Sequence, residues 1–169
     1  MLEGFFEAGK RDSDFRKNAR LYMIGPSYQG GGEEALTHVS KLKLNGKAHW
    51  IPPGEYPSGS LAPLASADAS LLFSRWDGFP RAIRESLELG VPFVVSEETH
   101  FEDVATEFDC GEVVDNADDP KSIAIALIKM YRYGGRQEME KQSLKAFESL
   151  CSKNLSKILL PKLQSNAEA

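Results

Sequence analysis

One short segment of the sequence, residues 74–85, holds the densest set of side chains able to bind a ligand. An apolar run over 69–73 ends there, a turn with Asp77 and Gly78 follows, and a helical pattern carries Glu85. The free N–H groups and the dipole of a helix's first turn favour phosphate and sugar hydroxyls. Asp77 in the turn and Glu85 on the second helical turn could border one pocket. These residue types predict a site for a phosphorylated or hydroxyl-rich ligand.

The backbone donors of this segment follow from the place of its proline. Pro80 suits the first turn of a helix but has no N–H. The candidate donors to an anion are therefore the amides of Phe79, Arg81 and Ala82. A simpler interpretation also exists, because Glu85 could form an ordinary ion pair with Arg81, and Asp77 could serve only as a helix cap.

The elements that must position this segment alternate between strand and helix. Strands are predicted at 20–24, 48–51, 69–73, 92–96 and 112–114. Helices are predicted at 2–8, 33–42, 61–67, 80–89, 101–108, 121–133 and 137–160, the last as one or two helices. Nearly continuous apolar strands belong to a parallel sheet that is covered on both faces. The sequence predicts an α/β, Rossmann-like doubly wound fold in one domain over 1–169, with the C-terminal helices at about 136–169.

In such a sheet, ligands bind at the carboxyl ends of the strands. The turns at that edge are 25–32, 52–56, 74–80, 97–100 and 115–119. Gly30, Gly31 and Gly32 lack the spacing of a dinucleotide-binding motif, so a loop is preferred there over a phosphate cradle. Trp76 could stack on a ligand or pack the turn equally well.

Composition excludes several classes of protein. The chain has 169 residues and a net charge of -5, without a long Lys/Arg block, which argues against a nucleic-acid partner. No apolar run approaches the roughly 18 residues of a membrane span. Cys110 and Cys151 show no zinc-site spacing and no signal peptide precedes them, so we expect a cytoplasmic protein and treat both as ordinary thiols.

No metal site is expected either. The three histidines have no metal-ligand spacing. Asp12-Ser13-Asp14 superficially matches a metal-binding Asp-x-Asp motif, but no strand precedes it. We therefore predict that this motif is a solvated loop, within a polar stretch over 10–18 that forms a loop or a frayed helix.

The segment resembles the C-terminal domain of family 4, or group 1, glycosyltransferases, which have the GT-B fold. The matching residues are Gly78, Phe79, Pro80, Glu85, Gly90 and Pro92. The chain departs from the family pattern at Asp77, where Glu is usual, and at Ser86, where Ala is common. Further blocks agree in order and spacing, at 21–26, 67–74, 94–96, 110–114 and 118–120.

The resemblance implies a nucleotide-sugar donor as substrate, with no cofactor and no metal. It implies that Glu85 contacts the ribose. It also implies that Asp77, with the amides of Gly78, Phe79 and Arg81, contacts the sugar and the diphosphate. The turn at Ile51 and Pro52 would flank the base, and Gly25 would let the diphosphate approach closely. No catalytic residue is assigned.

The family normally begins this domain with one more strand, carrying Arg and Lys for the diphosphate, and residues 1–15 hold no evident substitute. The N-terminal acceptor domain is absent too. We therefore expect a truncated chain, a split gene product or a fragment of a longer reading frame. Such a chain would be inactive alone and would need the missing domain or a partner chain, through which it could also contact a membrane.

Two functions stay open on these grounds. The first is a hexosyltransferase domain that helps transfer a sugar to a saccharide or lipid-linked acceptor, in polysaccharide or glycoconjugate biosynthesis. The second is a non-catalytic nucleotide-binding module or a subunit that needs a partner. An unrelated doubly wound domain, such as half of a sugar-nucleotide epimerase, is a weaker third reading.

The resemblance also makes a structural prediction. In the family's strand order the absent strand lies at the centre of the sheet, between 20–24 and 69–73. We expect a gap or distorted pairing between these two strands, marginal stability and a tendency to associate.

Overall fold

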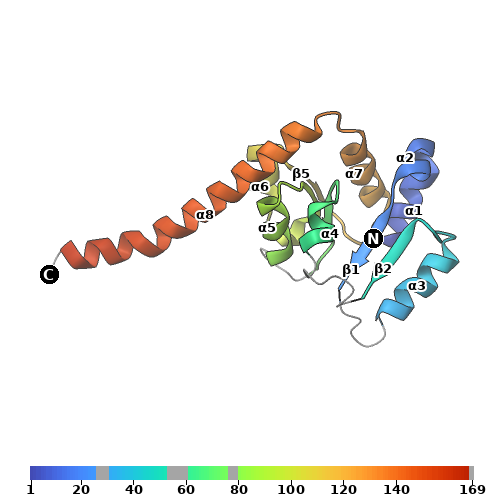
Figure 1. Ribbon diagram of the computed structural model, residues 1–169, viewed down its shortest axis with the longest axis horizontal. Coiled ribbons are helices and arrows are strands. Elements are labelled where there is room, and N and C mark those ends of the chain that lie inside the picture. Colours follow the sequence, from blue (N-terminus) through green and yellow to red (C-terminus); the bar gives the residue numbers. More distant parts are fainter. Residues whose placement is uncertain (26–30, 53–60, 76–79, 168–169) are drawn as a thin grey trace.

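The computed structural model describes residues 1–25, 31–52, 61–75 and 80–167, with 153–167 described by their backbone alone. Strands and helices alternate along the chain (Figure 1). The strands are β1 (Leu21–Ile24), β2 (Ala48–Ile51), β3 (Ser70–Leu72), β4 (Phe93–Ser96) and β5 (Gly111–Val114). The helices are α1 (Leu2–Arg11), α2 (Ser13–Asn18), α3 (Gly31–Lys41), α4 (Leu61–Ala65), α5 (Arg81–Glu88), α6 (Glu102–Phe108), α7 (Pro120–Arg132) and α8 (Arg136–Ala167), with a 3-10 turn at Glu97–Thr99.

All strand pairs are parallel, as predicted, but the strands form two separate sheets. β1 pairs with β2, with Leu21 opposite Ala48. β4 lies between β3 and β5, with Phe93 opposite both Ser70 and Gly111. Within the described residues β1 and β3 make no ladder with each other, which confirms the predicted gap.

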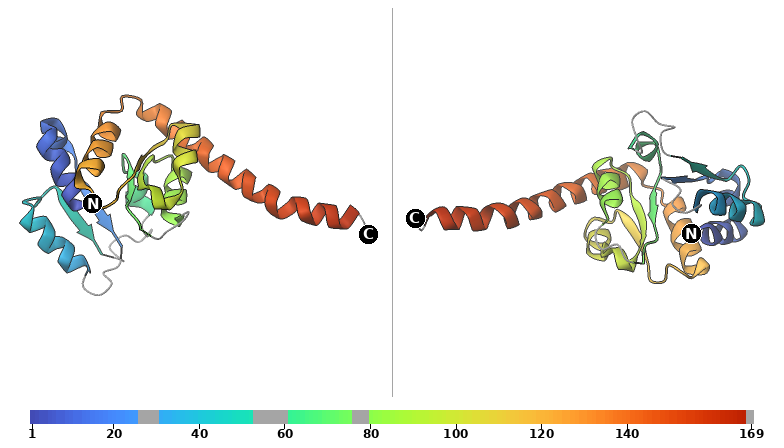
Figure 2. Two further views of the ribbon diagram at one scale, coloured as in Figure 1. Left: turned by 180° about the vertical axis from the view of Figure 1, so that it is seen from behind. Right: turned by 90° about the horizontal axis from the view of Figure 1, so that it is seen from below.

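Helices α1 and α7 join the two sheets on one face. They pack closely, since a Cβ added to Gly4 of α1 would lie 2.3 Å from Cγ2 of Ile123 on α7. Their apolar side chains share one core with Leu21 of β1, Val94 of β4 and Val114 of β5. Figure 2 shows the two groups of strands set apart, with α1 and α7 against each other beside them. The joint between the sheets is therefore helical.

The opposite face of the β3–β4–β5 sheet has its own core. Phe93 and Val95 of β4 are fully buried there against α5, α6 and the start of α8. The Phe93 and Phe101 rings meet edge to face, with centroids 5.5 Å apart. Helices on both faces make this the doubly wound α/β fold that the sequence predicted.

Most helices begin and end where capping residues and prolines in the sequence predict. Asp119 caps α7 by accepting hydrogen bonds from the amides of Lys121 and Ser122, and Pro120 is its first residue. The C-terminal region forms one helix, α8, which begins against α5 and α6 and extends beyond the rest of the molecule (Figure 1). One prediction was only half right, because the polar stretch expected as a loop or frayed helix contains α2, an ordered helix that a buried aspartate caps.

Candidate functional site

The candidate site lies at the carboxyl ends of β1, β2 and β3, beside the gap between the sheets. Figures 1 and 2 show β1 nearer than β2 to the other sheet. Moving away from the gap, the strands are therefore β1 and then β2 on one side, and β3, β4 and β5 in their hydrogen-bonded order on the other. The gap is thus the point at which the strand order reverses. In open parallel sheets, ligands bind outside the strand ends at such a point.

Gly25 ends β1 with a backbone that suits close approach. Its φ is 145°, in the region that favours glycine, and a Cβ built there would meet none of the described residues within 4 Å. Its N–H donates to the carbonyl of Ile51 over 3.4 Å, which ties the ends of β1 and β2 together. The structure therefore leaves open space beside this predicted site residue.

Trp50 is a residue of this region that sequence reasoning missed. Its indole Nε1 donates to the carbonyl of Gly25 over 3.2 Å. Its ring lies against Gly32 in the first turn of α3, where an added Cβ would come within 2.7 Å of the indole. Trp50 thereby holds the end of β1 and the start of α3. A tryptophan one residue before the end of a strand that leads into Pro52 was the available signal.

Ile51 and Pro52 end β2 at the same edge. Ile51 is buried in the core, whereas Pro52 is half-buried. Their predicted position beside a nucleotide base stays a prediction. Gly30 lies outside the described residues, while Gly31 and Gly32 begin α3, so these two are helical.

Arg81 and Glu85 lie on α5, which starts just after Pro80. The Arg81 Nε and the Glu85 Oε1 are 3.3 Å apart, and the two side chains are 88% and 34% exposed. The simpler alternative, an ion pair one turn apart, is therefore present. Asp77, Gly78 and Phe79, with Trp76, lie outside the described residues, so their predicted contacts stay predictions.

The end of β3 carries a second ion pair that the sequence did not predict. The carbonyl of Ser74 accepts a hydrogen bond from the Ser96 hydroxyl over 2.6 Å, which ties the ends of β3 and β4. The guanidinium of Arg75, the next residue, forms an ion pair with Asp118 in the turn between β5 and α7. This pair spans the β3 and β5 ends of the same edge.

The start of the chain lies at this edge too. Met1 and Met23, near the end of β1, line one shallow depression of about 520 Å³ together with residues of α3. Burial lowers the pKa of the Met1 amine, and the charges of Glu3 and Asp118 act in the opposite direction. The Met1 amine is therefore near the charge of Asp118, in the turn before α7.

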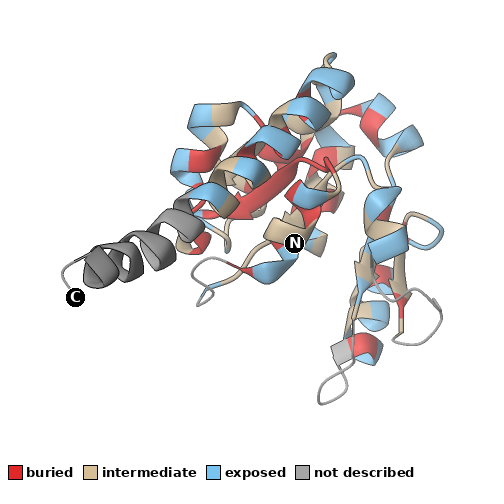
Figure 3. Cartoon of the chain, turned by 60° about the vertical axis from the view of Figure 1, so that its left-hand side comes forward, coloured by how far each residue is buried: buried red, intermediate tan, exposed pale blue. Residues whose placement is uncertain are grey.

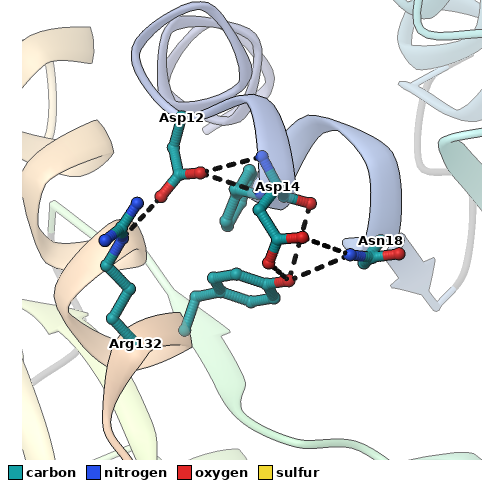
Figure 4. Close-up of polar contacts among 6 residues, drawn as sticks. Asp12, Asp14, Asn18 and Arg132 are labelled. Carbon is teal, nitrogen blue, oxygen red and sulfur yellow. Dashed lines mark hydrogen bonds and ion pairs between the residues drawn. The ribbon is translucent and has the colours of Figure 1, made fainter.

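The prediction for Asp12-Ser13-Asp14 was wrong, because Asp12 is buried and structural (Figure 4). Asp12 accepts hydrogen bonds from the amides of Asp14 and Phe15, which caps α2, and binds the Arg132 Nε over 2.7 Å. The hydrogen bond from Arg132 is the main reason that the pKa of Asp12 is lowered. Asp14 accepts a hydrogen bond from the Tyr131 hydroxyl at 2.6 Å. The motif therefore joins α2 to α7.

The described part of the chain shows neither an activated Cys110 thiol nor a metal-binding cluster. Burial raises the pKa of the Cys110 thiol to about 12, so it is not an activated nucleophile. Among the described residues, no cluster of three or more His, Cys, Asp or Glu side chains could hold a metal ion. Within those same ranges, no helix combines the length and apolarity needed to cross a bilayer.

Comparison with known proteins identifies the class. Residues 3–146 match the family described as glycosyl transferases group 1, which is most of the chain. The chain therefore belongs to the group 1 glycosyltransferase family. No curated protein matches it significantly.

Three solved structures show the fold. WaaG, a glycosyltransferase involved in lipopolysaccharide biosynthesis, is 16% identical with a TM-score of 0.70, over 93% of this chain and 43% of that one. Sucrose-phosphate synthase from Thermosynechococcus elongatus is 16% identical with a TM-score of 0.72, over 99% and 43%. The C-terminal domain of the group 1 protein LpcC from Francisella tularensis is 14% identical with a TM-score of 0.67, over 90% and 78%.

These matches locate the chain within the fold. It spans less than half of WaaG and of the sucrose-phosphate synthase, but most of the LpcC C-terminal domain. The chain has the GT-B glycosyltransferase fold and corresponds to its C-terminal domain, as the sequence predicted.

Proposed function

We propose that this chain binds the nucleotide-sugar donor of a glycosyltransferase that acts in polysaccharide or glycoconjugate biosynthesis. The acceptor would be a saccharide or a lipid-linked saccharide. The observation that carries the proposal is the carboxyl edge at the reversal of strand order, where no described residue lies within 4 Å of a Cβ built on Gly25. Membership of the group 1 family supports a donor of this kind.

Each predicted site residue has a role in this proposal. Gly25 admits the diphosphate to the end of β1, and Ile51 with Pro52 borders the base. Glu85 accepts hydrogen bonds from the ribose hydroxyls once its carboxylate turns from Arg81, to which it is bound without ligand. Because Glu85 is partly exposed, this exchange costs little. The roles proposed for Asp77, Gly78, Phe79 and the Arg81 amide are contacts to the sugar and the diphosphate.

The complete enzyme would be a hexosyltransferase whose acceptor site lies outside these 169 residues. The chain spans 43% of WaaG and of the sucrose-phosphate synthase, which leaves more than half of each without a counterpart here. We infer that this chain alone transfers no sugar and that the assembled enzyme works in the cytoplasm without a metal cofactor. The same partial coverage favours the second candidate, a nucleotide-binding subunit that depends on a partner.

Calorimetry on the purified chain tests donor binding. We expect UDP, GDP or ADP to bind weakly, and Glu85→Ala to abolish the binding. Glu88→Ala is the matched control, because Glu88 is an exposed glutamate on the same helix. Equal affinity of the parent chain and Glu85→Ala would show that the site is placed wrongly.

Transfer assays test the need for a second half. Incubation of pure protein with radiolabelled nucleotide sugars and a panel of saccharide acceptors should yield no labelled product. Sugar transfer by this chain alone would disprove the proposal that transfer needs a further domain.

A further inference from the structure

A donor diphosphate at this edge needs a cation, and the described residues offer few. A guanidinium suits phosphate oxygens best, because its fork donates two parallel, charge-assisted hydrogen bonds. Arg81 is at this edge too, on α5, where it pairs with Glu85 and where its backbone amide already has a proposed role. Arg75 lies three residues after the end of β3, the strand that borders the gap.

The backbone that carries Arg75 is held in place. β3 is in register with β4, with Leu72 opposite Val95. The adjoining carbonyl of Ser74 accepts the Ser96 hydrogen bond. The guanidinium therefore projects from an anchored strand end and not from the middle of a long loop.

The partner of Arg75 is easily replaced. Asp118 is 64% exposed and Arg75 is 63% exposed, so water screens their attraction. The amide of Asp118 donates to the Asn116 side chain over 2.9 Å, which sets the turn without help from Arg75. An anion that took the guanidinium would leave Asp118 in water, with no buried charge unpaired.

We propose that Arg75 binds the diphosphate of the nucleotide-sugar donor by exchanging Asp118 for phosphate oxygens. This inference rests on the proposed function and adds to it the residue that neutralises the diphosphate. Three observations carry it: the place of Arg75 at the reversal of strand order, its anchored backbone, and its exposed and exchangeable carboxylate partner. Asp118 then acts as a competitor that holds the guanidinium at the site when no donor is bound.

NMR titrations can measure weak binding and therefore suit this test. The affinities for UDP, GDP and ADP are compared with those for uridine, guanosine and adenosine, which lack the diphosphate. Arg75→Ala should weaken binding of the diphosphates at least about tenfold, the usual scale for losing a charged hydrogen-bond partner, and leave nucleoside affinity unchanged. Arg75→Lys should recover part of the loss, because it keeps the charge but not the fork. Asp118→Asn should tighten diphosphate binding, because it removes the competing charge.

Arg136→Ala is the matched control. Arg136 also forms an exposed ion pair, with Asp68 before β3, so the same charge is lost near the opposite edge of the sheet. This variant should bind diphosphates as the parent chain does. Thermal unfolding of all variants should match the parent, because exposed pairs contribute little to stability.

The outcomes separate the two levels of inference. If the parent chain binds diphosphates and Arg75→Ala binds them equally well, the assignment of Arg75 fails and the proposed function stands. If Arg136→Ala weakens binding as much as Arg75→Ala, general charge is responsible and the assignment also fails. If the parent chain binds no nucleoside diphosphate, both the assignment and the proposed function fail.

Discussion

The two sheets are built from similar apolar parallel strands, yet they differ in how well these strands are buried. All four residues of β4 are buried, and a strand drawn wholly in the buried colour is visible in Figure 3. In β1 buried and exposed residues alternate, and Tyr22 is 56% and Ile24 40% exposed. β4 has a strand on each side and helices on both faces, while β1 has one neighbouring strand. The number of neighbours, more than the residue types, decides how far a strand is buried.

The ladder pattern shows which way the free edge of β1 faces. The amide of Leu21 donates to Lys47 and that of Gly25 to Ile51, so alternate residues of β1 bond toward β2. In a parallel ladder the residues between them direct their N–H and C=O groups to the opposite side. For Tyr22 and Ile24 that side is the gap. An exposed apolar edge of this kind promotes association.

The largest expected effect is a core truncation in β4. Phe93→Ala removes a fully buried ring that packs against Phe101, so it should lower the free energy of unfolding by about 3–5 kcal/mol. The counterpart in β1, Tyr22→Ala, should cost under about 1 kcal/mol because the ring is exposed. Urea unfolding measures both changes, and similar costs would mean that β1 is as well buried as β4.

A smaller effect is expected where α1 and α7 join the two sheets. Gly4→Ala places a methyl group 2.3 Å from the Ile123 Cγ2, which should cost about 1–3 kcal/mol by overpacking. The matched control is Gly9→Ala on the same helix. There the nearest atom, of Arg16, is 3.5 Å away, and the gain in helix propensity should make the change neutral or stabilising. If Gly4→Ala left the free energy of unfolding in urea unchanged, this would contradict the close contact between α1 and α7.

The ion pair between α2 and α7 should make that joint sensitive to acid. The hydrogen bond from Arg132 holds the pKa of Asp12 below its ordinary value, so this stabilisation is complete above the unfolded pKa of about 3.9. It is lost as the pH falls through the lower, folded pKa. Asp12→Asn should therefore melt at a lower temperature than the parent near pH 7, with the difference narrowing below about pH 4.

Melting temperatures from pH 7 to pH 2 measure this difference. Asp103→Asn, at an exposed position of α6, is a control that should behave as the parent does. A difference that widened in acid would show that Asp12 does not act through its ionised form.

The smallest effect on stability should come from the free edge itself. Replacing Tyr22 and Ile24 by Thr should change the free energy of unfolding by less than about 0.5 kcal/mol per site, because both side chains are exposed. The same change should reduce concentration-dependent association in sedimentation experiments. Ile125→Thr, at an exposed isoleucine on α7, should leave association unchanged. If both variants associated to the same extent, the edge of β1 would not be the surface through which the chain associates.

Much of the fold could be predicted, because the formation of a strand or a helix depends mainly on residues that are close in sequence. The strand at 48–51 was predicted to the residue, and those at 20–24, 69–73 and 92–96 were only slightly too long. The cap at Asp119 and the proline after it act within one helical turn. Helix α2 was missed because its polar sequence has no apolar period, and a partner 120 residues away, Arg132, binds its cap.

The candidate site also contains features that the sequence could predict and residues whose role depends on contacts with distant parts of the chain. The unusual backbone of Gly25 could be expected, because a glycine at the end of an apolar strand marks a conformation that other residues avoid, while its role toward a diphosphate stays a prediction. Trp50 and Arg75 could not be predicted, because their significance lies in contacts with Gly32 and Asp118, which are distant in sequence. Pattern and periodicity are properties of a few consecutive residues, so the α/β alternation and most helix ends were already present in the chain. Pairing across the sheet depends on which surfaces meet, so the division into two sheets and the charge partners at their edge arose only on folding.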